Sequence, residues 1–406
     1  MTENFESTFR RHGDRLLAGI RGRIISQPLF YSSDRLREME RTYTLLHQVC
    51  EGYVRDYIED YSDIIPIKPH EMDIVRRYAG RPYRVGSIRP DFLLDCEGKM
   101  RICEINARFA LSGFIYGVFL ELERASMLGD ASLVRRAADN GWRVLERMKT
   151  ELGEEDGLVI LRGSNRELDS PWLRDLLKDV GEPVHYISSD DCSQHVDLLE
   201  KFPILIDFNQ TDLERLEDPT MEILVRRPHL NDLRTMLLVH DKRFFTFLCD
   251  ARFTRRYLAT EEDAAYLSSR FIETFTSRSH PDIWAGAVRE KAGWILKEAL
   301  LGKGEGIYIG RDTDPEHWQR LLTGNGRDTR ILQPFISQTK FDFPQGGRLQ
   351  QHLVGSFFGI SECFMGTNLV RCSADKIINF SSGSGDFAVS VVRDKDHIAS
   401  NAARWL

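Results

Sequence analysis

Three oxygen-bearing side chains in one short segment have the types that bind a divalent cation. Residues 89–108 read RPDFLLDCEGKMRICEINAR and predict a β-hairpin, whose two apolar strands flank Gly98, a residue free to take the positive φ of a turn. Asp91 lies at the start of this hairpin, and Glu104 and Asn106 lie at its end. Because side chains two positions apart on a strand share a face, Glu104 and Asn106 point the same way, roughly across from Asp91.

Two carboxylates and a carboxamide form a hard, all-oxygen ligand set, which suits Mg²⁺ bridging the phosphates of a substrate. Arg89 shares the face of Asp91 and adds a cation beside the anionic cluster. A second interpretation stays open on the residues alone, in which Asp91 and Glu104 are solvated polar positions on a half-exposed hairpin.

The whole chain has the size and composition of a globular protein with several domains. Its 406 residues allow two or three domains and a large core. The apolar fraction of 42% and the charged fraction of 29% are ordinary. A net charge of −7 provides no basic field for nucleic acid, so we expect small-molecule partners.

The cysteines and the apolar runs indicate a cytoplasmic protein. The seven cysteines are scattered and include no CxxC pair, which argues against a disulfide framework or a zinc site and fits a reducing compartment. The first 15 residues lack an apolar signal core, and no run of about 18 apolar residues exists to span a membrane.

Residues 1–80 look mostly helical. Residues 34–61 carry apolar side chains at helical spacing, and a second helix is predicted around residues 71–78. Residues 121–152 predict a charged amphipathic helical region. Between the hairpin and that region, Ser112 and Gly113 either form a turn that offers backbone N–H groups to a substrate or simply begin a helix.

Residues 158–208 predict a small parallel α/β layer, because short apolar strands alternate there with helices. The expected strands are residues 158–161, 184–187 and 204–208, and the expected helices are residues 170–180 and 196–201. Ligands bind beyond the carboxyl ends of such strands. The loop that contains Arg162 and Ser164 is therefore either a substrate loop or an ordinary connection.

A glycine-rich stretch late in the chain has the composition of a phosphate-binding flap. A strand over residues 294–297 ends near Lys297, and a second strand resumes at residue 307. The glycines between and beside them are Gly302, Gly304, Gly306 and Gly310, which let backbone N–H groups approach phosphates closely. Because the loop joins two strands, a flap over a nucleotide fits better than a Rossmann cradle. No Walker sequence occurs.

Further candidates are spread over the second half of the chain. Lys242 begins a helix whose apolar face belongs to the core, and a lone lysine there is usually a solvated surface residue. Gln333 lies in a connector whose backbone and side-chain amide could pair with an adenine edge.

The end of the chain predicts short strands at residues 349–354, 361–364, 368–373 and 377–380. Arg371 lies on one of them as a partner for a carboxylate or a phosphate. Residues 381–385, which include Ser384, form a Gly/Ser loop that either closes over phosphates or is a hairpin tip.

The order of these pieces resembles the ATP-grasp superfamily, specifically the branch of rearranged connectivity that contains eukaryotic-type glutathione synthetase and glutathionylspermidine synthetase. In that branch a hairpin reading R-x-D…E-x-N precedes the nucleotide-clamping sheets. Here it stands as Arg89, Asp91, Glu104 and Asn106. About a third of the chain carries the resemblance, best in the hairpin and in residues 294–310.

The resemblance implies an α+β and α/β multidomain fold, in which antiparallel sheets clamp ATP beside a small parallel α/β substrate domain. It divides the chain into a helical region with the metal-binding hairpin (residues 1–152), the substrate domain (residues 153–235) and the nucleotide-binding domain (residues 236–406). Close relatives are often dimers, which leaves a homodimer as one option, but the sequence itself does not give the oligomeric state.

The resemblance also implies individual roles. Mg²⁺ on the ATP phosphates would be held by Asp91, Glu104 and Asn106, and Arg89 would steady an acyl phosphate. The residues that would contact ATP are the lysines Lys242 and Lys297, the flap glycines Gly302, Gly304 and Gly306, and the hinge residues Gln333, Phe335 and Ile336.

One departure concerns the metal. Glutathione synthetases place a glutamate ligand just before the flap glycines, where this chain has Leu301. Either Glu305 or Glu298 substitutes for it, or the metal set is smaller. The family's Gly/Ala-rich lid appears here as residues 381–385, so glutathione is not the expected product.

The expected activity is that of an ATP-dependent carboxylate–amine ligase, which forms an amide through an acyl phosphate on amino-acid or small peptide-like substrates. ATP and Mg²⁺ are the expected cofactors. Two alternatives are an ATP-grasp kinase that phosphorylates without ligation and a catalytically silent binding or scaffold protein with the same fold.

Overall fold

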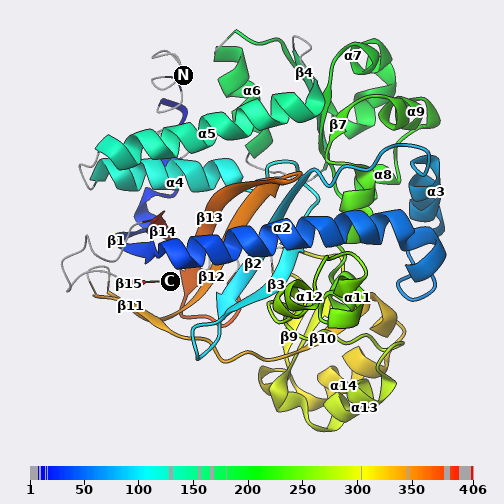
Figure 1. Cartoon of the computed structure of the whole chain (residues 1–406), viewed down its shortest axis with the longest axis vertical. Coiled ribbons are helices and arrows are strands. Elements are labelled where there is room, and N and C mark those ends of the chain that lie inside the picture. Colours follow the sequence, from blue (N-terminus) through cyan, green and yellow to red (C-terminus); the bar gives the residue numbers. More distant parts are fainter. Residues whose placement is uncertain are drawn as a thin grey trace.

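The structure is a computed structural model, and its described residues form three β-sheets with helices packed around them (Figure 1). The described residues are 8, 11–13, 15, 17–127, 131–153, 157–164, 169–179, 181–302, 304–344, 347–378, 385–392 and 404–405.

The largest sheet brings the first and the last parts of the chain together. Its strand order is β15-β1-β14-β13-β12-β2-β3, and β11 pairs with β12 outside this path. β1 runs parallel to β14 and β15, and the other pairs are antiparallel. The strands are β1 (Ile24–Tyr31), β2 (Ser87–Leu94), β3 (Met100–Asn106), β11 (Phe341–Phe343), β12 (Arg348–Ile360), β13 (Cys363–Ser373), β14 (Asp386–Val392) and β15 (Arg404–Trp405).

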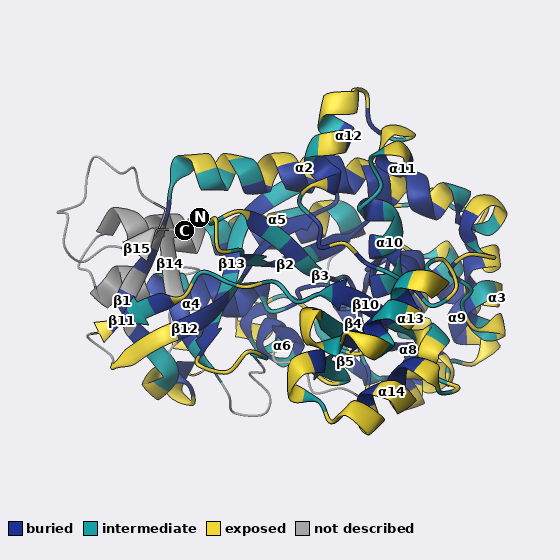
Figure 2. Ribbon diagram, turned by 90° about the horizontal axis from the view of Figure 1, so that it is seen from below, coloured by how far each residue is buried: buried dark blue, intermediate teal, exposed yellow. Residues whose placement is uncertain are grey.

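Helices cover both faces of this sheet. They are α2 (Ser33–Asp56), α4 (Phe114–Met127) and α5 (Ala131–Leu152), whereas α3 (Pro69–Arg77) lies away from the sheet, beside α9 (Asp218–Arg226; Figure 1). Phe357 and Phe358 are consecutive on β12 and point to opposite faces. Phe357 packs in the cluster that contains the side chains of α2, and the ring of Phe358 lies 4.6 Å from that of Phe114 on α4. The inward sides of α2 and the central strands are buried, whereas the outer face of α12 (Glu261–Ser268) is exposed (Figure 2).

The second sheet confirms the parallel layer. Its order is β5-β4-β6-β7, and every neighbouring pair is parallel. The strands are β4 (Leu158–Arg162), β5 (Val184–Ser188), β6 (Ile204–Asp207) and β7 (His229–Leu230), and the helices are α6 (Asp169–Asp179), α7 (Val196–Lys201), α8 (Gln210–Leu213) and α9 (Asp218–Arg226).

The third sheet is a small antiparallel one of order β10-β8-β9. Its strands are β8 (Trp294–Glu298), β9 (Ile307–Ile309) and β10 (Arg330–Pro334), and the nearby helices are α10 (Phe245–Leu248), α11 (Ala251–Arg255), α13 (Pro281–Arg289) and α14 (Pro315–Thr323). Trp284 and Trp318 pack with Leu296 and Leu332 on one face of this sheet. The glycine-rich loop therefore joins two antiparallel strands, as the sequence predicts.

Two predictions about secondary structure were wrong. Residues 24–31 form β1 inside the region expected to be helical, because β14, more than 350 residues later, supplies the paired backbone. The short late strands are in fact a long hairpin, which turns at Ser361 with φ +50°. Two glycines lie within β12 and do not interrupt it. Phe92 packs directly on Gly355 and Tyr43 on Gly359, and a Cβ on either glycine would lie within 2.4 Å of the ring.

Two further predictions are not decided by the structure. In the expected strand 377–380, residues 377 and 378 are not in a strand and the rest lie outside the described residues. The division of the chain at residues 152 and 235 stays a prediction.

One buried asparagine holds the base of the β2–β3 hairpin. Asn231 is fully buried, and its Oδ1 accepts hydrogen bonds from the backbone N–H (2.7 Å) and hydroxyl (3.0 Å) of Ser87. Its Nδ2 donates to the carbonyls of Ser87 (2.9 Å) and Ala107 (3.1 Å). These four bonds tie the start of β2 to the segment just after β3.

We expect Asn231→Leu, which has a similar volume, to destabilise the fold by about 2–4 kcal/mol, because it leaves the buried backbone groups of Ser87 and Ala107 without partners. The free energy of unfolding in urea measures this loss. Thr323→Val, which replaces an exposed hydroxyl at the end of α14, is the control and should change stability by less than about 0.5 kcal/mol. Equal losses in the two variants would refute the role of Asn231.

A buried histidine at the edge of the parallel sheet predicts a loss of stability in mild acid. The Nδ1 atom of His229 lies 3.1 Å from the guanidinium of Arg81, and its Nε2 lies 3.3 Å from the Tyr78 hydroxyl. Burial, together with the positive charge of Arg81, lowers the pKa of His229 from 6.5 to about 4. Between these values the unfolded chain binds a proton that the folded protein does not, so stability falls as pH falls from about 6.5 toward 4.

Because of His229, the free energy of unfolding should fall by about 2 kcal/mol when the pH is lowered from 7.5 to 5. His229→Gln should show a pH dependence weaker by that amount, whereas His317→Gln, at an exposed position on α14, should keep the parental slope. Urea titrations at the two pH values test this, and an unchanged slope in His229→Gln would contradict it.

Candidate functional site

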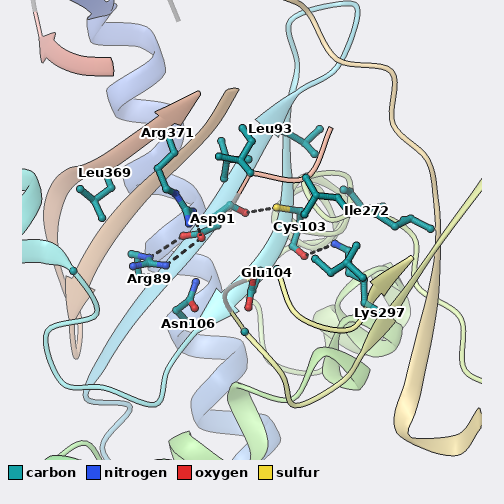
Figure 3. Close-up of a pocket in the computed structure, with 18 of the residues that line it drawn as sticks. Arg89, Asp91, Leu93, Cys103, Glu104, Asn106, Ile272, Lys297, Leu369 and Arg371 are labelled. Atoms are coloured by element: carbon teal, nitrogen blue, oxygen red, sulfur yellow. Dashed lines mark hydrogen bonds and ion pairs between the residues drawn. The ribbon is translucent and has the colours of Figure 1, made fainter. Parts of the chain in front are cut away.

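A cavity of about 300 Å³ lies between the largest sheet and the small antiparallel sheet, and its walls come from β2, β3, β8, β10, β12 and β13 (Figure 3). Most of the residues predicted from the sequence line it together. They are Arg89, Asp91, Glu104, Asn106, Ser112, Lys297, Gly302, Gly304, Gln333, Phe335, Ile336 and Arg371.

On one side of the cavity, two arginines share one carboxylate (Figure 3). Arg89 donates from Nε to Oδ1 of Asp91 (2.8 Å) and from Nη2 to Oδ2 (3.1 Å). Arg371 donates from Nη2 to the same Oδ2 (2.5 Å), across 280 residues of sequence. The Asp91 side chain is only 4% exposed, so its charge is compensated by this pairing and not by water.

The hairpin register places a second carboxylate opposite the first. Asp91 pairs with Glu104 across the two strands, and Arg89 pairs with Asn106. The Nζ of Lys242 lies 3.2 Å from Oε1 of Glu104 and also donates to the carbonyl of Leu301. Lys242 does not line the cavity but lies directly behind it, with a side chain that is only 3% exposed.

Lys297 reaches the same region from the opposite sheet, and its Nζ donates to the carbonyl of Cys103 (3.3 Å; Figure 3). Burial alone would raise the pKa of Glu104, but the charges of Lys242 and Lys297 outweigh it and hold that pKa below the ordinary value. Burial lowers the pKa of Lys297, against the opposing effect of Cys103 and Glu104. Burial also raises the pKa of the Cys103 thiol to about 11, so it is protonated at neutral pH.

Glu104 and Asn106 are the oxygen donors that best fit a divalent cation. Both line the cavity, and each has a side-chain oxygen, the ligand atom that Mg²⁺ prefers. Within the same residues, no three His, Cys, Asp or Glu side chains are arranged to hold a metal ion. Both oxygens of Asp91 accept from arginine, so its predicted role as a metal ligand stays a prediction.

The flap is a tight turn whose glycines are required by its backbone. Gly304 and Gly306 have φ of +77° and +66°, and a Cβ on Gly306 would lie 2.4 Å from the Cγ of Glu298. Neither candidate for the third metal carboxylate lines the cavity. Glu298 forms an ion pair with Arg330 (2.6 Å), and Glu305 is exposed.

At the far end of the cavity, a hydrogen-bond chain fixes the orientation of the Gln333 amide. Thr274 donates its only hydroxyl proton to the carbonyl of Ile272 (2.9 Å) and so accepts from the Nε2 of Gln333 (2.8 Å). The Oε1 of Gln333 is left without a partner among the described residues. The wall beside it is apolar and includes Ile272, Ile295 and Ile307.

The predicted substrate loop lies elsewhere. Ser164 belongs to a network in which its N–H donates to Asp212 (2.9 Å) and its hydroxyl accepts from Asn209 (3.2 Å). Arg162 lies over the ring of Tyr186 at 6.0 Å. Neither Arg162, Ser164 nor the flap residue Gly306 lines the cavity, and Ser384 lies outside the described residues.

The Ser112–Gly113 turn precedes α4 with φ values of +46° and +80°. The Gly113 N–H donates to Asp169 at the start of α6, and the carbonyl of Ser112 accepts from Arg89. The segment is therefore both a turn and the start of a helix. The backbone N–H of Gly113 donates to a carboxylate of the protein itself, Asp169.

Sequence reasoning missed several polar residues of the cavity wall, among them Arg108, Tyr116, Asp169, Gln338 and Lys376. Arg108 continues the alternation of Glu104 and Asn106 and was detectable from that spacing. Lys376 is paired with Asp312 (2.6 Å), and no local pattern around either residue indicates this contact.

Two comparisons with known proteins bear on this site. A family model described as the AnkG N-terminal domain matches residues 42–238, which include the hairpin and the parallel sheet. The ATP-grasp enzyme ankG of Aspergillus thermomutatus is 22% identical over 437 residues, which cover 91% of this chain and 88% of that protein. This second match supports a place in the ATP-grasp superfamily. In the part of the chain that the structure describes, no helix is long and apolar enough to cross a bilayer.

We expect Asp91→Asn to destabilise the protein by about 3–5 kcal/mol, because it removes the negative charge between two arginines and turns an amide toward their N–H groups. Urea unfolding measures the loss. Asp34→Asn removes an exposed partner of Arg37 and should cost less than about 1 kcal/mol. The interpretation fails if both variants lose the same small amount.

Proposed function

We propose that this protein is an ATP-dependent ligase that joins a carboxylate to an amine through an acyl phosphate. One observation carries the proposal: the glycine flap and Lys297, with Lys242 directly behind them, lie on one side of a single cavity, and two arginines lie on the other side. The named activity class of the ankG relative supports the same conclusion.

We place the protein in the branch of rearranged connectivity for a reason of chain order. The hairpin that carries Arg89, Asp91, Glu104 and Asn106 precedes the parallel sheet, and the sheet with Lys297 and the flap follows it. This order is what the resemblance to glutathione synthetase implies. The domain boundaries at residues 152 and 235 and a homodimer belong to the same proposal.

The cavity fits a nucleotide. The adenine would lie against the isoleucine wall near Phe335 and Ile336, where the Oε1 of Gln333 is an acceptor for an exocyclic amine. The phosphates would lie between Lys297 and the flap glycines, with Lys242 behind. Glu104 and Asn106 would hold Mg²⁺, which when bound neutralises phosphate charge.

The proposed reaction has two steps. A carboxylate oxygen of the acid substrate attacks the γ-phosphorus of ATP, and ADP leaves with the electrons of the broken P–O bond. The amine nitrogen then attacks the acyl carbon, phosphate leaves, and the amine loses its proton to phosphate or solvent. Arg89 and Arg371 are aimed by Asp91 and stabilise the acid carboxylate and the oxyanion that forms on it.

One observation favours a second candidate, a binding protein without turnover. Leu301 stands where the related synthetases have a metal-binding glutamate, and neither Glu298 nor Glu305 replaces it in the cavity wall. A two-donor site of Glu104 and Asn106 needs oxygens from the phosphates and water to complete the six ligands of Mg²⁺.

Calorimetry and an ADP-release screen separate these candidates. We expect the purified protein to bind ATP with Mg²⁺ and to release ADP only when an acid and an amine are both present. Lys297→Met should weaken nucleotide binding roughly 10- to 100-fold through loss of a charged hydrogen-bond donor. Lys99→Ala, at the exposed hairpin turn, is the control and should bind as the parent does.

The outcomes are distinct. ADP release with an acid alone indicates a kinase, and nucleotide binding without release for any pair of substrates indicates the binding protein. Unchanged affinity in Lys297→Met would remove that lysine from the nucleotide site. Chelation of Mg²⁺ with EDTA should abolish ADP release, and release that persists in EDTA would contradict the metal assignment.

A further inference from the structure

Arg108 is a cavity residue that belongs to none of the motifs described above. It follows Asn106 by two positions, just beyond the end of β3, and is half-buried in the cavity wall. Its Nη1 lies 3.4 Å from the side-chain oxygen of Gln210 at the start of α8, and its guanidinium carbon lies 5.4 Å from the centre of the Phe109 ring. These contacts hold the side chain between the hairpin and the parallel sheet.

The guanidinium of Arg108 lies directly against the flap. A Cβ placed on Gly302 would be 2.9 Å from the Nη2 of Arg108. Gly302 has no positive φ, unlike Gly304 and Gly306. Its lack of a side chain therefore serves the close approach of Arg108 to the base of the flap.

Arg108 lies on the lysine side of the cavity. Lys242 donates to the carbonyl of Leu301, the residue before Gly302, so Arg108 and Lys242 both reach the base of the flap. The positive charge of Arg108 also contributes to the lowered pKa of His240, after the larger effect of burial, and His240 contacts the backbone at the end of β3. Arg89 and Arg371 lie on the other side of the cavity, where both pair with Asp91.

We propose that Arg108 binds the terminal phosphate of a nucleoside triphosphate beneath the flap, so that the site distinguishes ATP from ADP. The proposal rests on the nucleotide site of the proposed function and adds a residue to it. A planar guanidinium with several donors suits two oxygens of one phosphate, as a lysine does not. The place at the flap base, away from the Asp91 cluster, favours a phosphate over the carboxylate of the acid substrate.

The test compares the affinities of a triphosphate and a diphosphate. Dissociation constants for the β,γ-imido analogue of ATP and for ADP, both with Mg²⁺, are measured by calorimetry in the full chain, Arg108→Gln, Arg108→Lys and Arg101→Gln. Arg101 is the matched control, because it lies on β3, pairs with Asp95 (2.9 Å) and does not line the cavity.

We expect Arg108→Gln to weaken binding of the triphosphate analogue roughly 10- to 100-fold and binding of ADP less than twofold. Arg108→Lys should fall between this variant and the parent, and it keeps the test available if the glutamine variant does not fold. Arg101→Gln should leave both constants unchanged.

Three results would overturn the proposal. If Arg108→Gln keeps the parental ratio of the dissociation constants for the triphosphate analogue and ADP, Arg108 does not contact the terminal phosphate. The proposed nucleotide site would still stand in that case. The same ratio with a raised KM for the acid substrate assigns Arg108 to that substrate. A parent protein that binds neither nucleotide removes the proposed function together with this inference.

Discussion

The Asp91 carboxylate between two guanidinium groups is the contact on which the site depends. A buried carboxylate is tolerated only when cations and hydrogen bonds replace its water, and Arg89 and Arg371 supply both. Arg371 reaches Asp91 from β13 across β12, so the contact forms only when the early hairpin and the late strands are in one sheet. The orientation of Arg371 therefore depends on the pairing of the early and late strands in that sheet.

Two groups of charges lie in the cavity wall and directly behind it. Asp91 with its two arginines occupies one side, and Glu104 with Lys242 and Lys297 occupies the other. Each group has two cations for one carboxylate and so carries one excess positive charge. An anion is favoured in each place, and in a cavity of low dielectric such a preference is stronger than at the surface. The separation suits two anionic reactants that must lie side by side without sharing the same cations.

Much of this arrangement was predictable because it depends on local patterns. Alternation and Gly98 indicate the hairpin, and the apolar run before Arg162 indicates a parallel strand. The parts that were not predictable depend on distant partners. β1 is a strand because β14 pairs with it. Lys242 can be buried because its ammonium group forms an ion pair with Glu104 and donates a hydrogen bond to the carbonyl of Leu301. The residues that lie nearby in the sequence give no indication of either contact.

The pairing of Glu104 with lysines is compatible with its proposed role as a metal ligand. Lysine ammonium groups are attracted to phosphate, and a carboxylate that loses such a partner gains in affinity for a divalent cation. In the proposed function, the phosphates of the nucleotide would attract Lys242 and Lys297, and the Glu104 carboxylate would then be available to bind Mg²⁺. Both oxygens of Asp91 accept instead from Arg89 and Arg371, which come from strands of the same sheet. The two acids, which face each other across the hairpin, therefore differ in their partners: Glu104 is paired with a lysine and Asp91 with two arginines.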